Sequence, residues 1–155
     1  RALILRTIVA VLLLLATTFS YAAEFEFEDL QGKIHRLIDY REKWVLVNFW
    51  ATWCPPCLNE MPELNSLHNA HKDKDLVVIG VAMHSGTKSG ILRFVDAHHI
   101  EYPIVMGTRK SAAQIGVIDA LPVSYLYNPA GEQVISHVGE VSRDSIESFI
   151  RSDRK

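Results

Sequence analysis

The feature that most constrains this chain is a pair of cysteines, Cys54 and Cys57, separated by two prolines. They are the only cysteines in the sequence, so no framework of several disulfides can support the fold. A bond between them would close a very short loop, which in a loop-entropy description stabilises a protein by only about 2 kcal/mol. Such a close pair is a poor structural staple, and its spacing therefore favours chemistry over stabilisation.

The pair is predicted to join a strand to a helix. Residues 44–50 are mostly apolar and β-favouring, which is typical of a central strand buried on both faces, and residues 55–71 can form a helix. Cys54 would then lie at the helix N-terminus, where unpaired N–H groups and the helix dipole favour a thiolate. The two prolines suit the first helical turn, where their missing donors cost nothing. We therefore expect Cys54 to attack a disulfide and the more buried Cys57 to resolve the mixed disulfide.

The rest of the sequence alternates between strand and helix patterns. Short apolar or alternating runs predict strands at residues 25–30, 33–38, 75–82, 103–106, 123–127 and 132–138. Helices are predicted at residues 91–99, 111–115 and 142–151, and in the first of these Ile91, Phe94, Val95 and His98 are candidates for the inner face. This order indicates an α/β fold with a mixed central sheet flanked by helices. Cys54 would follow the carboxyl end of a central strand, the usual place for a site in such sheets.

The N-terminal segment has the layout of an export signal. Arg1 and Arg6 precede an apolar run at residues 8–16, and small residues lead up to Ala22. We expect residues 1–22 to be a signal peptide, with a retained N-terminal membrane anchor as the alternative, and residues 23–155 to form one domain. In either case the globular part is expected in the periplasm or on the extracytoplasmic face.

The net charge and the number of possible metal ligands bear on two other functions, nucleic-acid binding and metal binding. The formal net charge is -2 and there is no basic stripe, which argues against nucleic acid as a partner. Two cysteines are also half of a zinc site, although zinc needs four ligands and a second cysteine pair is absent. Metal binding and inert buried thiols therefore stay open as alternatives, and the histidines are otherwise expected at the surface or at an edge. The candidate histidine ligands are His68, His71, His84, His98, His99 and His137.

Two motifs resemble one family. Residues 48–57 read Asn-Phe-Trp-Ala-Thr-Trp-Cys-Pro-Pro-Cys, and residues 60–64 read Glu-Met-Pro-Glu-Leu. Together they are similar to extracytoplasmic thioredoxin-like proteins of the TlpA/ResA/CcmG type. Residues 121–126, Leu-Pro-Val-Ser-Tyr-Leu, look like the loop whose proline is cis and packs beside the active-site disulfide. The resemblance covers about residues 24–155 and implies a thioredoxin fold with an N-terminal β-hairpin and a central αβ insertion.

The resemblance also implies roles for particular side chains. Trp53, Leu121 and a cis Pro122 would contact the substrate, and Glu60 matches an acid that tunes the cysteines in some relatives. If Glu60 is buried, its charge opposes thiolate formation and its carboxylate can carry a proton; a solvated carboxylate on the helix surface is the alternative. Plain thioredoxins have a buried acid where this chain has Asn48, and a neutral amide cannot act as a base. This departure makes Glu60 the candidate for the base that Asn48 cannot provide.

The function expected from the resemblance is a monomeric, exported thiol-disulfide oxidoreductase that needs no cofactor and no metal. The leading hypothesis is a reductase of substrate proteins with cysteine pairs, for example in cytochrome c maturation or copper-site assembly. A membrane electron donor of the DsbD/CcdA type would recharge it. The alternatives are an oxidase or isomerase of secreted-protein disulfides and a metal chaperone.

Overall fold

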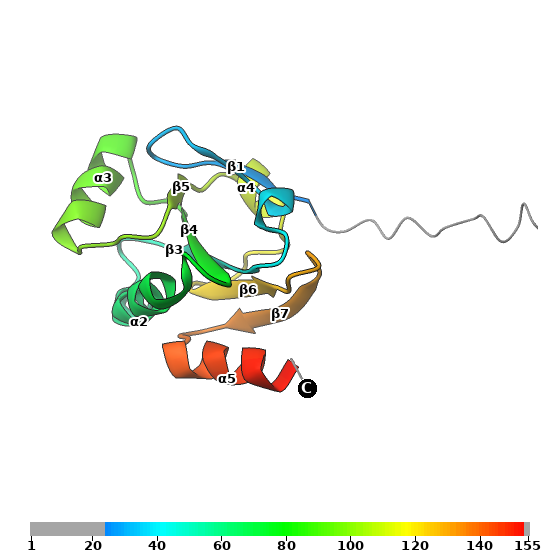
Figure 1. Cartoon of the computed structure of the whole chain (residues 1–155). Helices are drawn as coiled ribbons and strands as arrows, with labels where there is room; N and C mark the ends of the chain where they lie inside the picture. The colour runs from blue at the N-terminus through cyan, green and yellow to red at the C-terminus, as the bar shows by residue number, and fades with distance from the viewer. Residues whose placement is uncertain (1–23, 154–155) are drawn as a thin grey trace, which may run out of the picture.

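The computed structural model describes residues 24–153, so the expected signal peptide at residues 1–22 lies outside the described residues. The element order is β1 (Glu26–Glu28), β2 (Ile34–Arg36), the 3-10 helix η1 (Leu37–Tyr40), β3 (Trp44–Trp50), α2 (Pro55–His71), β4 (Leu76–Ala82), α3 (Lys88–Ala97), β5 (Ile104–Met106), α4 (Arg109–Ala113), β6 (Val123–Tyr127), β7 (Gln133–Val138) and α5 (Arg143–Asp153) (Figure 1). No helix in this part of the chain combines the length and the apolar character needed to cross a membrane.

The central sheet is mixed, as predicted. Its strand order is β5-β4-β3-β6-β7, and a separate two-stranded hairpin is formed by β1 and β2. Strand β3 pairs in parallel with β4 and antiparallel with β6, while β4 and β5 are parallel and β6 and β7 antiparallel. Helix α3 and strand β5 follow β4 as the central insertion. The predicted α/β thioredoxin-like fold with an N-terminal hairpin is therefore confirmed.

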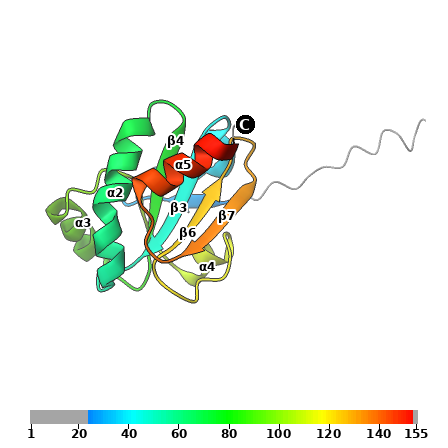
Figure 2. The ribbon, with the colours of Figure 1, turned by 90° about the horizontal axis from the view of Figure 1, so that it is seen from below.

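Alternate side chains along the buried strand β3 belong to two different hydrophobic cores. Side chains of Trp44, Leu46 and Trp50 belong to one core, which also contains residues of α2, α3 and α5. Side chains of Val45, Val47 and Phe49 belong to the other, which contains residues of β1 and η1. Figures 1 and 2 show α2 and α5 on the same side of the sheet. Because side chains on a strand alternate between the faces, Asn48 is directed to the side of α2.

The main differences from the predicted elements concern their ends. The second strand ends at Arg36, and the chain continues as η1 instead of extending the strand to residue 38. Helix α3 begins at Lys88, three residues earlier than expected, because the Thr87 side chain accepts a hydrogen bond from the Gly90 N–H as N-cap. Helix α4 likewise begins at Arg109 behind the N-cap Thr108. His98 is exposed and is not on the inner face of α3.

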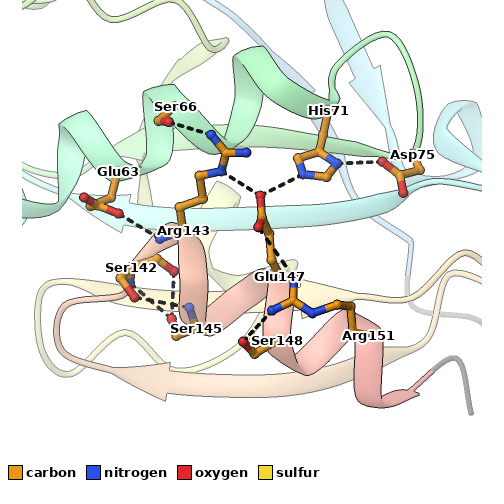
Figure 3. Close-up of polar contacts among 10 residues, drawn as sticks. All are labelled: Glu63, Ser66, His71, Asp75, Ser142, Arg143, Ser145, Glu147, Ser148 and Arg151. Carbon is orange, nitrogen blue, oxygen red and sulfur yellow. Dashed lines mark hydrogen bonds and ion pairs between the residues drawn. The ribbon is translucent and has the colours of Figure 1, made fainter.

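A polar network fastens α5 to α2 (Figure 3). The Arg143 guanidinium donates to Glu147 at 2.6 Å within α5 and to Ser66 of α2 at 3.0 Å. The two ring nitrogens of His71 lie 2.7 Å from an Asp75 oxygen and 3.0 Å from a Glu147 oxygen. Ile146 and Ile150 of α5 are buried in the same core as α2. The C-terminal helix is thus held by both apolar burial and side-chain hydrogen bonds.

The expectation that the histidines lie at the surface is wrong for two of them. His35 is buried in the hairpin. Its Nε2 lies 2.7 Å from an Asp29 carboxylate oxygen, and its Nδ1 is hydrogen-bonded to the Tyr40 hydroxyl. His68 is buried on α2, and its Nδ1 accepts a hydrogen bond of 3.1 Å from the Val78 N–H. The partners of His35 lie five and six residues away, outside its own strand, and the partner of His68 lies in β4.

Replacing His68 with asparagine should change how stability depends on pH. Burial, and then the charge of Lys72, lowers the pKa of His68 from 6.5 to about 4. Below about pH 6.5 the unfolded chain therefore takes up a proton that the folded chain refuses, and stability is lost as the pH falls. The advantage of the wild type over His68→Asn is expected to shrink by about 2–3 kcal/mol between about pH 7 and pH 4. Urea unfolding of both proteins at each pH measures this, and a constant difference would contradict it.

Candidate active site

The two cysteines lie where β3 passes into α2. Cys54 is the N-cap residue of α2, with the two prolines in the first turn, and Cys57 is completely buried one turn further along. The two residues are joined by a disulfide, with their Cα atoms 5.3 Å apart. Helix N-termini present unpaired N–H groups and a partial positive charge. A thiolate on Cys54 would therefore be stabilised where it forms.

Cys54 lines an open, largely apolar groove of about 380 Å³. Trp53 lines it and is 63% exposed, and its indole N–H donates to the His84 carbonyl at 3.0 Å. Leu121 also lines it, and the peptide bond between Leu121 and Pro122 is cis, the geometry implied by the resemblance. The groove brings together segments on either side of the central insertion. An extended chain carrying a cysteine can approach Cys54 here.

Several residues that line this groove were not predicted from the sequence. Met83 and His84 come from the segment after β4, and Ile118 and Asp119 come from the loop before β6. Their sequence carries no motif that marks them, because their position follows from how β4 and β6 flank β3. Pro122 is buried and is not among the residues that line the groove.

Glu60 is buried and not a solvated carboxylate on the helix surface, since only 2% of its surface is exposed. One carboxylate oxygen accepts a hydrogen bond of 2.8 Å from the Asn48 amide, and the other accepts one of 2.9 Å from the Val141 N–H. The Asn48 amide also donates to the Ser124 hydroxyl at 3.0 Å. Asn48 and Ser124 are paired across β3 and β6. The expected acid is therefore held by a polar network that the sequence did not reveal.

The pKa of Glu60 is raised from 4.5 to about 7. Burial is the main cause, because it penalises the charged carboxylate. The two hydrogen bonds favour the charged form and offset part of this effect, while the charge of Glu140 adds to it. At neutral pH Glu60 is consequently divided between its two protonation states, as an efficient general acid and base should be.

Cys57 and Glu60 are three positions apart on α2, so they are neighbours on the helix, with Cβ atoms typically about 5–6 Å apart. Both belong to the buried side of the helix. This arrangement can carry out dithiol–disulfide exchange. Two cysteines form the redox pair, an open groove gives access to the Cys54 sulfur, and a titrating carboxylate lies near Cys57. Among residues 24–153, no cluster of three or more His, Cys, Asp or Glu side chains is arranged to hold a metal ion.

Comparison with known proteins agrees with this geometry. Residues 20–136 match the AhpC/TSA family. The chain is 32% identical over 133 residues to "Thiol-disulfide oxidoreductase ResA" of Geobacillus kaustophilus, covering 86% of this chain and 76% of that protein. It is 33% identical over 136 residues to the protein of the same name from Halalkalibacterium halodurans, covering 88% and 77%. A solved structure described as a DsbF homologue from Corynebacterium diphtheriae superposes with a TM-score of 0.76 at 28% identity, covering 84% and 85%.

The fold and the cysteine pair define a thioredoxin-like thiol-disulfide oxidoreductase. The chain belongs to the AhpC/TSA family and is related within it to the ResA thiol-disulfide oxidoreductases.

Proposed function

We propose that this chain is an exported reductase of protein disulfides in which Cys54 attacks and Cys57 resolves. The observation that carries these roles is the difference in access to the two sulfurs. Cys54, although only 5% exposed, lines the groove at the start of α2, whereas Cys57 is completely buried and does not line it. A substrate disulfide can therefore reach Cys54, while Cys57 can reach only a disulfide that already includes Cys54.

The proposed reaction has two exchanges. The Cys54 thiolate attacks a substrate disulfide, which releases one substrate thiolate and leaves a mixed disulfide. Cys57 then gives its proton to the Glu60 carboxylate and attacks the Cys54 sulfur, which forms the Cys54–Cys57 bond and releases the second substrate thiolate. The released thiolates take up protons, the substrate gains two electrons and the enzyme loses two. Glu60 suits this step because its pKa of about 7 lies near the working pH.

The proposed substrates are proteins with cysteine pairs, such as those in cytochrome c maturation or copper-site assembly. Trp53 and Leu121 would contact the segment around the substrate cysteine, and the cis bond to Pro122 would hold the Leu121 backbone beside it. The apolar lining of the groove supports apolar neighbours of that cysteine. We further propose a monomer recharged by a membrane electron donor of the DsbD/CcdA type, with no cofactor and no metal.

The proposed location is the periplasm or the extracytoplasmic face. The motif at residues 1–22 supports export as a signal peptide or an N-terminal anchor, with the thioredoxin-like domain at residues 23–155. Glutathione and related systems keep cytoplasmic thiols reduced. An enzyme that reduces selected disulfides is therefore most useful where disulfides persist.

The redox potential of the Cys54–Cys57 pair tests the direction of electron flow. We expect a value near that of thioredoxin, about -270 mV, because a reductase must leave its own disulfide more stable than that of its substrate. Equilibration of the purified protein with glutathione or dithiothreitol buffers, followed by thiol alkylation, measures it. A value near about -120 mV would assign the pair to an oxidase or isomerase instead. Stable copper or zinc uptake by the reduced protein, abolished by Cys54→Ser, would support a metal chaperone.

A further inference from the structure

A second cleft, separate from the groove at Cys54, is lined by Glu60. It has a volume of about 560 Å³ and is lined by residues of α2, β7, the β7–α5 connection and α5. It shares no lining residue with the groove at Cys54. Glu60 lines this cleft and not the groove. The buried carboxylate therefore has an opening of its own.

The proposed function requires such an opening for protons. Cys57 is completely buried, and in the mixed disulfide the substrate is attached to Cys54 in the groove. The proton that leaves Cys57 therefore meets no solvent on the substrate side. Glu60, its neighbour on α2, is the acceptor proposed above, and the proton must then leave Glu60 before the next cycle.

The hydrogen bonds of Glu60 limit where that proton can go. Its partners are the Asn48 amide and the Val141 N–H, and both act as donors. An amide NH₂ group and a backbone N–H cannot accept a proton. Neither partner can relay the proton further into the protein, which leaves the cleft as the direction of escape.

We propose that the proton taken up by Glu60 leaves through this cleft, with His137 and Glu140 handing it to water, so that protons and substrate use separate openings. The inference rests on the proposed function and adds a route to it. His137 of β7 and Glu140 of the β7–α5 connection line the cleft and are exposed. An imidazole can accept a proton on one ring nitrogen while it donates one from the other, which suits His137 to relay protons.

The other groups that face Glu60 are compatible with this route. From α2, Glu63 lines the cleft as a second carboxylate, and α5 contributes only hydroxyl and apolar side chains to the lining. On the inner side Glu60 faces Asn48, and the pKa of the buried Tyr102 is raised by burial and then by the charge of Glu60. No lysine or arginine side chain is among the residues that line the cleft in the described part of the chain. Negative charge at the cleft therefore favours the movement of protons through it.

The walls of the cleft are fixed in place. Glu63 of α2 accepts a hydrogen bond of 3.0 Å from the Arg143 N–H at the start of α5, and the Arg143 side chain binds Ser66 (Figure 3). At the surface, the Asn59 amide donates to Glu140 at 3.2 Å. These contacts connect α5 and Glu140 to α2 around the cleft.

The test separates the two exchanges with an aryl disulfide that releases a coloured thiol in each. Attack by Cys54 on the reagent releases the first aryl thiol, and attack by Cys57 on the mixed disulfide releases the second. Stopped-flow absorbance on the reduced full chain at about pH 6 then gives both rates. At this pH Glu60, with its pKa of about 7, is mostly protonated and must lose that proton before it can accept the one from Cys57. Asn59→Trp, which places a large side chain in the cleft, is expected to slow the second release at least about tenfold and to leave the first unchanged. The matched control Asn69→Trp, exposed on the same helix but outside the cleft, is expected to change neither.

A second variant keeps the inference testable if Asn59→Trp perturbs the helix. His137→Ala should slow the second release by about threefold to tenfold, and added imidazole should restore it, while His98→Ala should have no effect. Rescue would require an imidazole-sized relay, which a structural role of His137 does not predict. Second-release rates equal to the controls in both cleft variants, with the same pH dependence, would overturn the proposed route. If the wild type released no aryl thiol in the first exchange, this would instead contradict the attacking role of Cys54 in the proposed function.

Discussion

Cys57→Ser is expected to stop turnover and to leave the substrate covalently attached to Cys54. The serine hydroxyl cannot attack the mixed disulfide under these conditions, so the reaction should halt after the first exchange. We expect turnover to fall by at least about 10³-fold, because the two thiols act as a unit. Non-reducing electrophoresis and mass spectrometry of the purified variant should show one substrate chain bound through Cys54, released by dithiothreitol.

Cys54→Ser is the matched control for this trap. It removes the sulfur that lines the groove and keeps Cys57, which is buried. Turnover should be lost equally, but no mixed disulfide should accumulate. The opposite pattern, with substrate held by Cys54→Ser and none by Cys57→Ser, would show that the proposed roles are reversed and that α2 moves enough to expose Cys57.

Glu60→Gln is expected to slow resolution by at least about tenfold, since the general base catalysis that it removes typically contributes about 10²–10⁴-fold. One effect opposes this loss. An ionised Glu60 disfavours a thiolate on its neighbour, and its removal lowers the pKa of the Cys57 thiol. At about one pKa unit this would return about tenfold in thiolate, which is less than the loss of the base. The net result is a slower second exchange in the aryl disulfide assay.

The pH dependence should distinguish loss of a base from loss of packing. In the wild type the resolution rate should rise with pH and level off above about 7, once Glu60 has ionised. In Glu60→Gln the rate should instead keep rising as the Cys57 thiol ionises, with no break near pH 7. Glutamine keeps the size of the side chain and an oxygen that can accept from Asn48. Glu101→Gln, which removes an exposed carboxylate outside the cleft, should keep the wild-type profile. An unchanged profile in Glu60→Gln would exclude Glu60 as the base.

Local patterns were sufficient to predict the strand at residues 44–50 and the helix at residues 55–71, and both have these bounds in the structure. An unbroken apolar run and two prolines at a helix start are signals within a few residues. Element ends were less predictable, as at Lys88, where the cap of Thr87 extended α3. The burial of His68 was missed because its partner, the Val78 N–H, belongs to strand β4.

The sequence by itself determined that the chain carries a pair of thiols able to exchange disulfides at the start of a helix. Two cysteines separated by two prolines behind an apolar strand specify that arrangement through local sterics and helix geometry. Only the tertiary structure decided that Glu60 is buried and has its own cleft. Its two donors, Asn48 and Val141, lie 12 and 81 residues away, and its raised pKa results from burial, which these two hydrogen bonds only partly offset. Burial and solvent access depend on how distant segments pack, and no local pattern encodes them.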